Sequence, residues 1–342
     1  MKKELIISGV CLGIAFSAYK FYKSLNARIS FNPKYQERHQ VYLDRIPDDL
    51  SFAGEPVQFN SPEAYDKFYR EQRFNTHKNS STRLLLKNVR HWLPHIAQVL
   101  KENGLPEDLK YVAVAESNML NNALSPKGAA GFWQLQEQTA IELGLEINDE
   151  VDERYHPTKS TRAAARYFRQ AHRQFGNWTS AAASYNRGIN GLQRAFTAQS
   201  VNSYYELALN SETSRYLYRI VAIKDLISNP HRYGMKVRNN HFKINKVRVD
   251  SSITDLSDFA VNYGINYELL KEYNPWIKKN TLTIKQPGKY YILLLPDRAS
   301  LPKEIEVETI TTTDSVISSL KNEEKVTPHS EWIDPATRIN SF

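Results

Sequence analysis

A glutamate at the end of an apolar helical stripe is the first candidate for chemistry in this sequence. After Pro106, three apolar residues and one acidic residue follow at i, i+3, i+4 and i+7, the spacing of one helix face: Leu109, Val112, Ala113 and Glu116. A carboxylate on such a face is costly unless it is paired, protonated or used. Partial burial raises the pKa of a glutamate towards neutrality, which suits a general acid at pH 7. The alternative is a frayed helix end with Glu116 in solvent.

Further groups of small and polar residues follow Glu116 along the chain. The next residue is Ser117. Three later groups read LSPKGAAGFWQL from Leu124 to Leu135, AAASYNRG from Ala181 to Gly188 and SETSRY from Ser211 to Tyr216. Gly128 and Gly131 indicate a tight turn in the first of these groups. Each group alone is a weak signal, whereas their order and spacing together are specific.

In that order and spacing, the chain resembles the soluble-lytic-transglycosylase-like family, and within it the membrane-bound lytic murein transglycosylases. Members carry Glu-Ser, Ser-x-x-Gly-Ala-x-Gly-x-x-Gln, Ala-Tyr-Asn-x-Gly and Glu-Thr-x-x-Tyr, and the match covers roughly residues 82–233. The chain departs from the pattern at Ser184, where the family usually has alanine, and at Phe132-Trp133, where many relatives have Leu-Met or Ile-Trp. The resemblance implies a mainly α, lysozyme-like catalytic domain that cleaves the MurNAc–GlcNAc β-1,4 bond of peptidoglycan.

The resemblance also implies roles for single residues. Glu116 would protonate the leaving glycosidic oxygen and then act as base on the MurNAc 6-hydroxyl, which closes a 1,6-anhydro ring. The implied substrate-binding residues are Ser117, Gln134, Tyr185, Asn186, Glu212 and Tyr216. The tyrosine–asparagine pair would contact the sugar and its N-acetyl group, Ser117 and Gln134 would position the substrate or orient Glu116, and the last two would line or brace the cleft. Purely structural hydrogen bonding by Gln134 and Glu212, and packing by Tyr216, are the alternatives.

The chain has no obvious second catalytic carboxylate. Ordinary glycosidases use two carboxylates, whereas the resemblance implies that the 6-hydroxyl replaces water and that the N-acetyl group helps to stabilise positive charge. The rival source is the run NDEVDE at 148–153, which we interpret as a solvated loop. If one of its carboxylates reached the cleft with a water, the enzyme would be a lysozyme-type hydrolase. A non-catalytic peptidoglycan-binding protein is the other alternative.

The helices that must position these residues follow from apolar periodicity. We predict helices from about residue 81 to Gly104, from Pro106 past Glu116, and over about 160–175, 178–187 and 211–229. They form an all-α catalytic domain at 81–235, in which Trp133 and Trp178 belong to the core. Residues 24–80 are polar and contain four prolines, so we predict an irregular lead-in with little helix.

A second, smaller module is predicted at 242–297. A β-like run, Phe242 to Val249, precedes helical stretches at Leu256–Tyr263 and Tyr267–Tyr273, and a second β-like run covers Lys289–Leu295. This β-α-α-β order, with Asn-Pro after the second helix, resembles a LysM peptidoglycan-binding repeat. The usual Gly-Asp-Thr-Leu start is replaced by SITDL at 252–256. The module therefore either binds glycan or only packs on the enzyme.

The ends of the chain have a different composition. Residues 1–23 contain two leading lysines and an apolar stretch of about 15 residues, shorter than the roughly 20 of a membrane span, and predict a signal peptide or an N-terminal membrane anchor. Residues 298–342 are rich in Ser, Thr, Glu and Lys and predict a disordered tail. We therefore expect export to the periplasm or cell envelope.

Net charge and cysteine content limit the classes of partner, metal site and disulfide that the chain can have. Lys and Arg exceed Asp and Glu by 8, so nucleic acid, anionic lipid and acidic polymers are the partner classes that charge allows. The motif groups favour peptidoglycan strands, and no motif supports nucleic acid. The single cysteine excludes an intramolecular disulfide, and the histidine spacing contains no zinc motif, so we expect neither metal nor cofactor. We expect a monomer, with membrane contact through residues 1–23.

Overall fold

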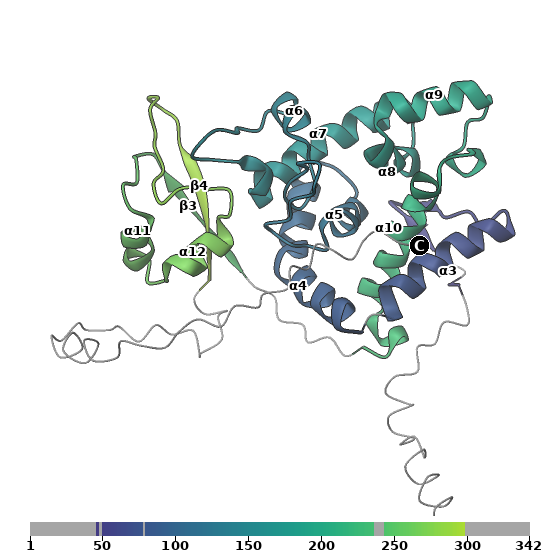
Figure 1. Cartoon of the computed structure of the whole chain (residues 1–342), viewed down its shortest axis with the longest axis horizontal. Helices are drawn as coiled ribbons and strands as arrows, with labels where there is room; N and C mark the ends of the chain where they lie inside the picture. The colour runs from purple at the N-terminus through teal and green to yellow at the C-terminus, as the bar shows by residue number, and fades with distance from the viewer. Residues whose placement is uncertain (1–45, 48–49, 78, 236–242, 298–342) are drawn as a thin grey trace, which may run out of the picture. The chain divides into compact units, whose positions relative to one another are not determined.

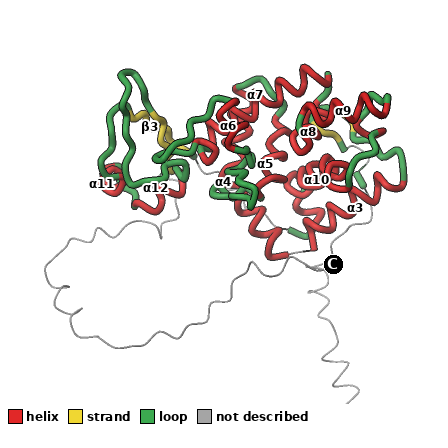
Figure 2. The backbone as a smooth tube through the Cα atoms, turned by 45° about the horizontal axis from the view of Figure 1, so that its top comes forward, coloured by secondary structure: helices red, strands yellow, loops and turns green. Residues whose placement is uncertain are grey.

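The computed structural model describes residues 46–47, 50–77, 79–235 and 243–297 (Figure 1). The predicted targeting segment at 1–23, the first part of the lead-in and the predicted tail at 298–342 lie outside these residues. The described chain is mainly α, as predicted, and its strands are short (Figure 2). Within the described ranges, none of the helices combines the length and hydrophobicity needed to span a bilayer.

The helical domain contains eight α-helices in its described residues. Their bounds are α3 Pro62–His77, α4 Asn79–Glu102, α5 Lys110–Ser117, α6 Glu137–Glu142, α7 Pro157–Phe175, α8 Trp178–Arg187, α9 Ile189–Gln199 and α10 Ser211–Ser228. A two-residue antiparallel pair, β1 Ser51–Phe52 and β2 Glu55–Pro56, precedes them. Short 3-10 turns lie at Glu107–Leu109, Tyr204–Glu206 and Pro230–Tyr233, and another at Glu153–Tyr155 leads into α7.

Helix ends follow local chemistry. Pro157 occupies the first turn of α7, where its missing N–H is not needed, and Gly176 ends α7 in the left-handed region. The side chain of Asn177 accepts a hydrogen bond from the Ser180 N–H and caps α8, and Asn210 does the same for α10. Small residues on the inner face of α7 allow close approach of α4 and α8. The predicted ends of these helices are therefore close to the observed ones.

The short helix α5 lies at the centre of the domain. It contacts α4 and α10, and α10 in turn packs against α3 and α8 (Figure 1). Three residues of the predicted apolar stripe, Leu109, Val112 and Ala113, are fully buried. The helix that carries Glu116 is thus held in place by two longer helices, α4 and α10.

The prediction of an irregular lead-in at 24–80 is wrong for residues 62–77, which form α3. Pro62 is one of the four prolines on which that prediction rests, but it stands in the first turn of the helix, where proline is compatible with the backbone. Most of this helix is polar, so its periodicity is weak in the sequence. Its buried side carries Ala64, Phe68 and the buried Glu71, and packs against α10.

The LysM-like module has the predicted β-α-α-β order. It comprises β3 Ile244–Val249, α11 Leu256–Asn262, α12 Tyr267–Tyr273 and β4 Tyr291–Pro296, with β3 and β4 paired antiparallel. Phe242, the predicted first residue of β3, lies outside the described residues. The buried Asn274 explains the Asn-Pro signature: its Nδ2 donates to the Leu270 and Leu294 carbonyls, and its Oδ1 accepts from the Leu294 N–H. This side chain joins α12 to β4.

Candidate active site

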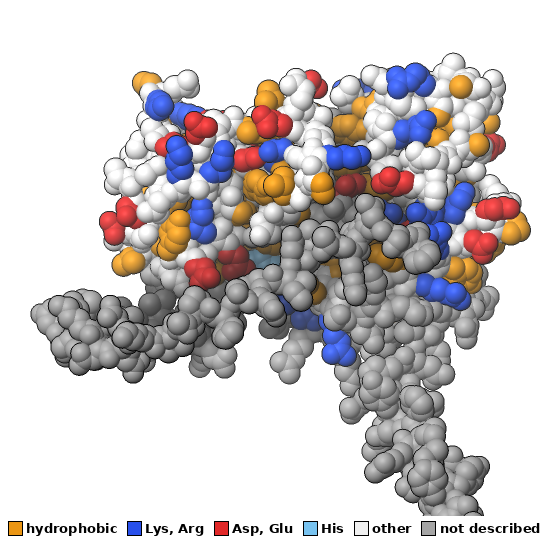
Figure 3. Space-filling view, viewed as in Figure 1, with side chains coloured by type: hydrophobic (Ala, Val, Ile, Leu, Met, Phe, Trp, Pro, Cys, Tyr) orange, Lys and Arg blue, Asp and Glu red, His pale blue; other side chains and the backbone are white. Residues whose placement is uncertain are grey.

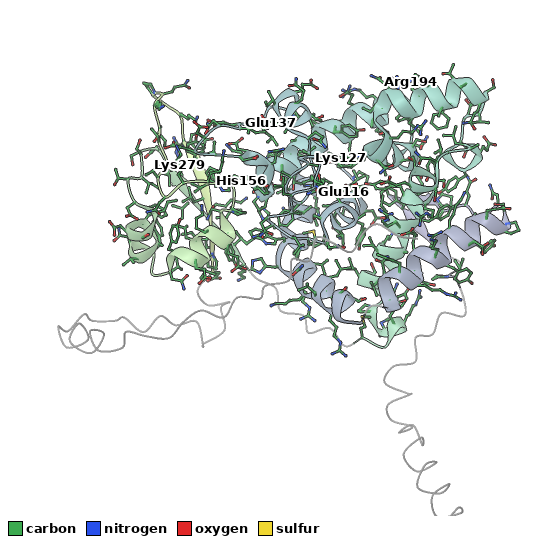
Figure 4. The ribbon with its side chains drawn as sticks, in the orientation of Figure 1. Glu116, Lys127, Glu137, His156, Arg194 and Lys279 are labelled. Carbon is green, nitrogen blue, oxygen red and sulfur yellow. The ribbon has the colours of Figure 1, made fainter. Side chains whose placement is uncertain are left out.

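Helix α5 places Glu116 at its C-terminal end. Asn118 ends the helix with φ of 50°, and Met119 follows with φ of 58°, so two non-glycine residues in succession adopt the left-handed region. The chain therefore turns sharply directly after Ser117. Figure 4 shows Glu116 within the helical domain. Glu116 is partly exposed, while its neighbours Val114 and Ser117 are buried.

The carboxylate of Glu116 accepts a hydrogen bond from the hydroxyl of Tyr216, a buried residue of α10. Desolvation raises the pKa of Glu116, and the negative charge of Glu212 raises it further. The hydrogen bond from Tyr216 and the positive charge of Arg219 lower it, but desolvation is the larger effect. The frayed-end alternative is therefore wrong: Glu116 is desolvated and held in place, as a general acid requires.

Tyr185 and Asn186 reach the same region from α8. The Tyr185 hydroxyl donates to the Trp133 carbonyl over 2.7 Å, and its ring stacks on Phe168. Burial raises the pKa of Tyr185 well above its usual range, and the charge of Glu116 adds to this effect. Tyr185 therefore lies within electrostatic reach of Glu116.

Asn186 joins α8 to the start of α10. Its Oδ1 accepts from the Thr213 hydroxyl over 2.9 Å, and its Nδ2 donates to the exposed carboxylate of Glu212 over 3.3 Å. Asn186 and Glu212, which were each predicted to bind substrate, are thus in direct contact with one another. Both sides of the amide have partners, which fix its orientation.

Gln134 lies in the turn of the Gly-rich group with φ of 46°. Its Nε2 donates to the carbonyls of Gly131 and Ala123, so this part of the side chain stabilises its own loop. A Cβ at Gly131 would lie 2.0 Å from the Arg154 carbonyl oxygen, so no other residue fits there without a shift. The predicted turn role of Gly131 has this physical basis.

Ser117 differs from its expected role as a contact for substrate. Its side chain is buried, donates to the Ala113 carbonyl over 2.9 Å and accepts from the Met119 N–H over 3.2 Å. The hydroxyl therefore stabilises the sharp turn after α5. Of the two roles predicted for Ser117, these contacts favour orientation of Glu116, through the backbone, over positioning of the substrate.

Two family models match the chain. The model of the transglycosylase SLT domain matches residues 95–207, and the model of the soluble lytic transglycosylase C-terminal LysM-like domain matches residues 245–299. The chain contains a transglycosylase SLT domain and a LysM-like domain. The SLT match includes Glu116, Gln134, Tyr185 and Asn186, whereas Tyr216 lies beyond its end and still contacts Glu116.

Two curated proteins are similar to parts of the chain. Membrane-bound lytic murein transglycosylase D of Escherichia coli is 27% identical over 267 residues, which cover 75% of this chain and 58% of the relative. A putative tributyltin chloride resistance protein of an Alteromonas species is 32% identical over 107 residues, or 31% of this chain and 52% of that protein. The chain thus spans less than two thirds of the length of these relatives.

Among solved structures, an inactive mutant of the lytic transglycosylase Slt from Pseudomonas aeruginosa matches with 21% identity and a TM-score of 0.32. The match covers 40% of this chain and 24% of that chain.

The acidic run 148–153 is only partly the solvated loop that the sequence suggested: Asn148 and Asp149 are exposed, whereas the rest of the run is half-buried or buried. Asp152 and Glu153 are buried, and they pair with Arg154 and Lys159. Glu150 accepts hydrogen bonds from Thr281 and Thr283 of the LysM-like domain. These three carboxylates are therefore committed to structure, which disfavours this run as the source of a second catalytic carboxylate.

The two tryptophans predicted for the core, Trp133 and Trp178, differ in burial. Trp133 is fully buried, and its Nε1 donates to the Thr161 hydroxyl over 2.9 Å. Trp178 is half-buried and stacks on His172 at 4.0 Å between ring centroids. Trp133 agrees with the core role predicted for it, whereas Trp178 only packs against the core from a partly buried position.

The sequence reasoning missed an ion-pair network behind the site. Glu71 of α3 is buried and pairs with Arg215 and Arg219 of α10, on either side of Tyr216 in the sequence. Arg219 also acts on the pKa of Glu116. Because the sequence predicts no helix at residues 62–77, it gives no sign that Glu71 faces these arginines.

The visible face of the described chain carries charges of both signs. Lys and Arg are interspersed with Asp and Glu over the visible face (Figure 3). Among the described residues, no group of three or more His, Cys, Asp or Glu is arranged to hold a metal ion.

Removing the Tyr216 hydroxyl is expected to shift the pH profile. A general acid is active when protonated, so the rate should fall as the pH rises through the pKa of Glu116. Tyr216→Phe deletes a hydrogen bond that lowers this pKa, so the fall should move to higher pH, by about 1 unit if the bond contributes about 1.4 kcal/mol. The kcat/KM profile of both proteins measures the shift. A parent rate that stays flat from about pH 5 to 9 would contradict the acid role.

Proposed function

We propose that this chain is a lytic transglycosylase that cleaves the MurNAc–GlcNAc β-1,4 bond of peptidoglycan. The observation that carries the proposal is Glu116: a partly exposed carboxyl with a raised pKa, held by Tyr216, in an SLT domain. A raised pKa keeps more of the carboxyl protonated near neutral pH, and the protonated form can donate to the leaving oxygen.

The reaction needs one residue in two roles. Glu116 donates its proton to the glycosidic oxygen of the leaving GlcNAc as the bond to MurNAc C1 breaks. The carboxylate then takes the proton of the MurNAc 6-hydroxyl, whose oxygen bonds to C1 and closes the 1,6-anhydro ring. The proton balance at Glu116 is restored, and no water is consumed. The hydrogen bond from Tyr216 keeps the carboxylate oriented through both steps.

Asn186 supplies a donor for the substrate. An asparagine amide has two N–H donors, and one of them is directed to Glu212. We assign the other to the carbonyl of the N-acetyl group beside the cut. Thr213 and Glu212 act as positioning residues, since they fix the amide plane. Tyr185 and Gln134 line the same cleft, where their side chains position the sugar.

The site of action follows from the substrate. The relative in Escherichia coli is named a membrane-bound murein transglycosylase, and peptidoglycan lies in the cell envelope, so we place this chain there. Export or membrane attachment through residues 1–23 is part of the same proposal. We also propose that the chain acts as a monomer and needs no cofactor.

The mass of the products tests the reaction type. A transglycosylase leaves anhydro ends that are lighter by one water than hydrolytic ends. We therefore expect mass spectrometry of digested sacculi to detect anhydroMurNAc ends as the main products. Reducing MurNAc ends as main products would replace the proposal with the hydrolase alternative.

Glu212 provides the matched test of that alternative. Its carboxylate acts electrostatically on Glu116, so it is the residue that a hydrolase would use as its second carboxylate. Under our proposal Glu212→Gln keeps an acceptor for Asn186 and reduces the rate by about 10-fold or less. A loss near 10³-fold would instead indicate a general base.

A further inference from the structure

The LysM-like domain is joined to the SLT domain by a short β-like pairing. Val151 pairs antiparallel with Ile277; the Asp152 N–H donates to the Trp276 carbonyl over 2.8 Å, and the Lys278 N–H donates to the Glu150 carbonyl over 2.7 Å. Val151 is buried in the core of the LysM-like domain. Residues 150–152 are thus covalently part of one domain and packed in the other.

Asp152 also starts a connection back to the candidate active site. Its carboxylate accepts hydrogen bonds from Nε and Nη2 of Arg154, and the shortest, from Nη2 to Oδ2, is 2.7 Å. Both side chains are over 90% buried. The remaining donor, Nη1 of Arg154, reaches the carbonyls of Gly128 over 2.8 Å and Leu135 over 3.4 Å. The guanidinium therefore joins residues 150–152 to both ends of the turn that carries Gln134.

A second contact holds the other end of this loop. The Asn121 Nδ2 donates to the Glu272 carbonyl of α12 over 2.7 Å. Residues 121–135 follow directly after α5, so the loop is fixed between the helix that carries Glu116 and the LysM-like domain. A buried ion pair contributes little net stability on average, but a planar guanidinium with five donors fixes several acceptors in one geometry.

We propose that Asp152 and Arg154 form a positioning pair that couples the LysM-like domain to the substrate-binding loop 121–135. The LysM-like domain then sets the geometry of the site, in addition to any contact it makes with glycan. This inference rests on the proposed function for its kinetic consequence, whereas its structural part does not depend on activity.

Three substitutions in the full chain separate positioning from stability. Arg154→Lys keeps a charge for Asp152, but a single ammonium cannot reproduce the fork that also reaches Gly128 and Leu135. Arg154→Met removes both functions. Arg232→Met is the matched control, because Arg232 pairs with the buried Asp225 far along the chain from the loop.

Hydrogen exchange and kinetics provide the readouts. For Arg154→Lys we expect unfolding temperature near that of the parent, with exchange in peptides covering 121–135 faster by about 10-fold. With a soluble, peptide-free GlcNAc–MurNAc oligomer, kcat/KM should fall by about 10-fold or more, mainly through KM. The pH profile should stay unchanged, because Glu116 is set by α5 and Tyr216. The control should change neither loop exchange nor KM.

The coupling itself is tested from the LysM-like side. Glu150→Ala removes the contacts with Thr281 and Thr283, and we expect it to speed exchange in 121–135 severalfold. Added to Arg154→Lys, it should give no further increase, since both act on one connection. Faster exchange confined to 276–283, or an Arg154→Lys variant equal to the parent in exchange and KM, would overturn the proposal. If the parent does not cleave the oligomer, the proposed function fails, while the exchange results still decide the coupling.

Discussion

Glu116→Gln is expected to reduce peptidoglycan solubilisation by about 10³-fold or more, because in the proposed mechanism the residue serves as acid and then as base. Glutamine has nearly the same shape and can still accept the hydrogen bond from Tyr216. It can neither donate the proton to the leaving oxygen nor take one from the 6-hydroxyl. Release of soluble muropeptides from sacculi, measured against time, gives the rate for both proteins.

The control for this prediction must separate chemistry from folding. Removing a desolvated charge relieves a cost, so the unfolding temperature of Glu116→Gln should equal or exceed that of the parent. Glu107→Gln is a matched variant, because Glu107 precedes the same helix and is half exposed. Its Oε2 lies 3.8 Å from Nζ of Lys110. It should retain the parent rate. A rate for Glu116→Gln equal to the parent would remove the enzyme proposal and favour a non-catalytic binding protein.

The fold was predictable where burial follows a regular pattern. The amphipathic faces of α4, α7 and α10 and the Asn and Gly residues at their ends placed these helices within a few residues. The short helix α6 and the polar helix α3 were missed, because tertiary contacts stabilise them more than their own periodicity does. Helix α9 was missed because it begins directly after Gly188, where the sequence indicates the end of a helix. The LysM-like order was predictable for the same reason as the long helices, since its apolar runs are compact and bounded by turn residues.

The members of the candidate site were predictable, but their connections were not. The apolar stripe indicated burial near Glu116, and the spacing of the motif groups brought Tyr185, Asn186 and Tyr216 together with it. Sequence spacing could not show that Ser117 faces its own backbone. It also could not show that the end of the acidic run, Val151 to Glu153, is buried against the LysM-like domain, because the partners Trp276 and Ile277 lie far along the chain.

Acidification is expected to destabilise the chain through three desolvated histidines near the contact between the two domains: His156 is buried, and His91 and His95 are half-buried. Burial lowers the pKa of His91 and His95 to about 4 and that of His156 to about 3. His91 packs on Tyr273, and His156 stacks on Trp276, with its Nε2 3.1 Å from the Ile292 carbonyl oxygen. Protonation of these rings therefore opposes the packing of the LysM-like domain.

The sign follows from proton uptake. The unfolded chain protonates each histidine near pH 6.5, whereas the folded chain does so only near pH 4 or below. Between these values the unfolded state binds more protons, so stability is full above about pH 6.5 and falls as the pH decreases. At pH 5 each histidine then costs about 1–2 kcal/mol, at 1.36 kcal/mol per pH unit. The raised pKa of Glu116 acts in the opposite direction, so the effect must be measured as a difference between variants.

Urea unfolding of the parent and of His156→Gln at pH 7.5 and pH 5 measures this difference. Glutamine offers an N–H to the Ile292 carbonyl but has no proton to gain, so the variant should lose less stability on acidification, by about 1–2 kcal/mol at pH 5. His231→Gln alters an exposed histidine and should keep the slope of the parent. An identical pH dependence for the parent and His156→Gln would mean that His156 is not held neutral by burial. A weaker dependence of unfolding free energy on pH in His156→Gln, by contrast, would assign the acid sensitivity to the His156 ring, which lies between the SLT and LysM-like domains.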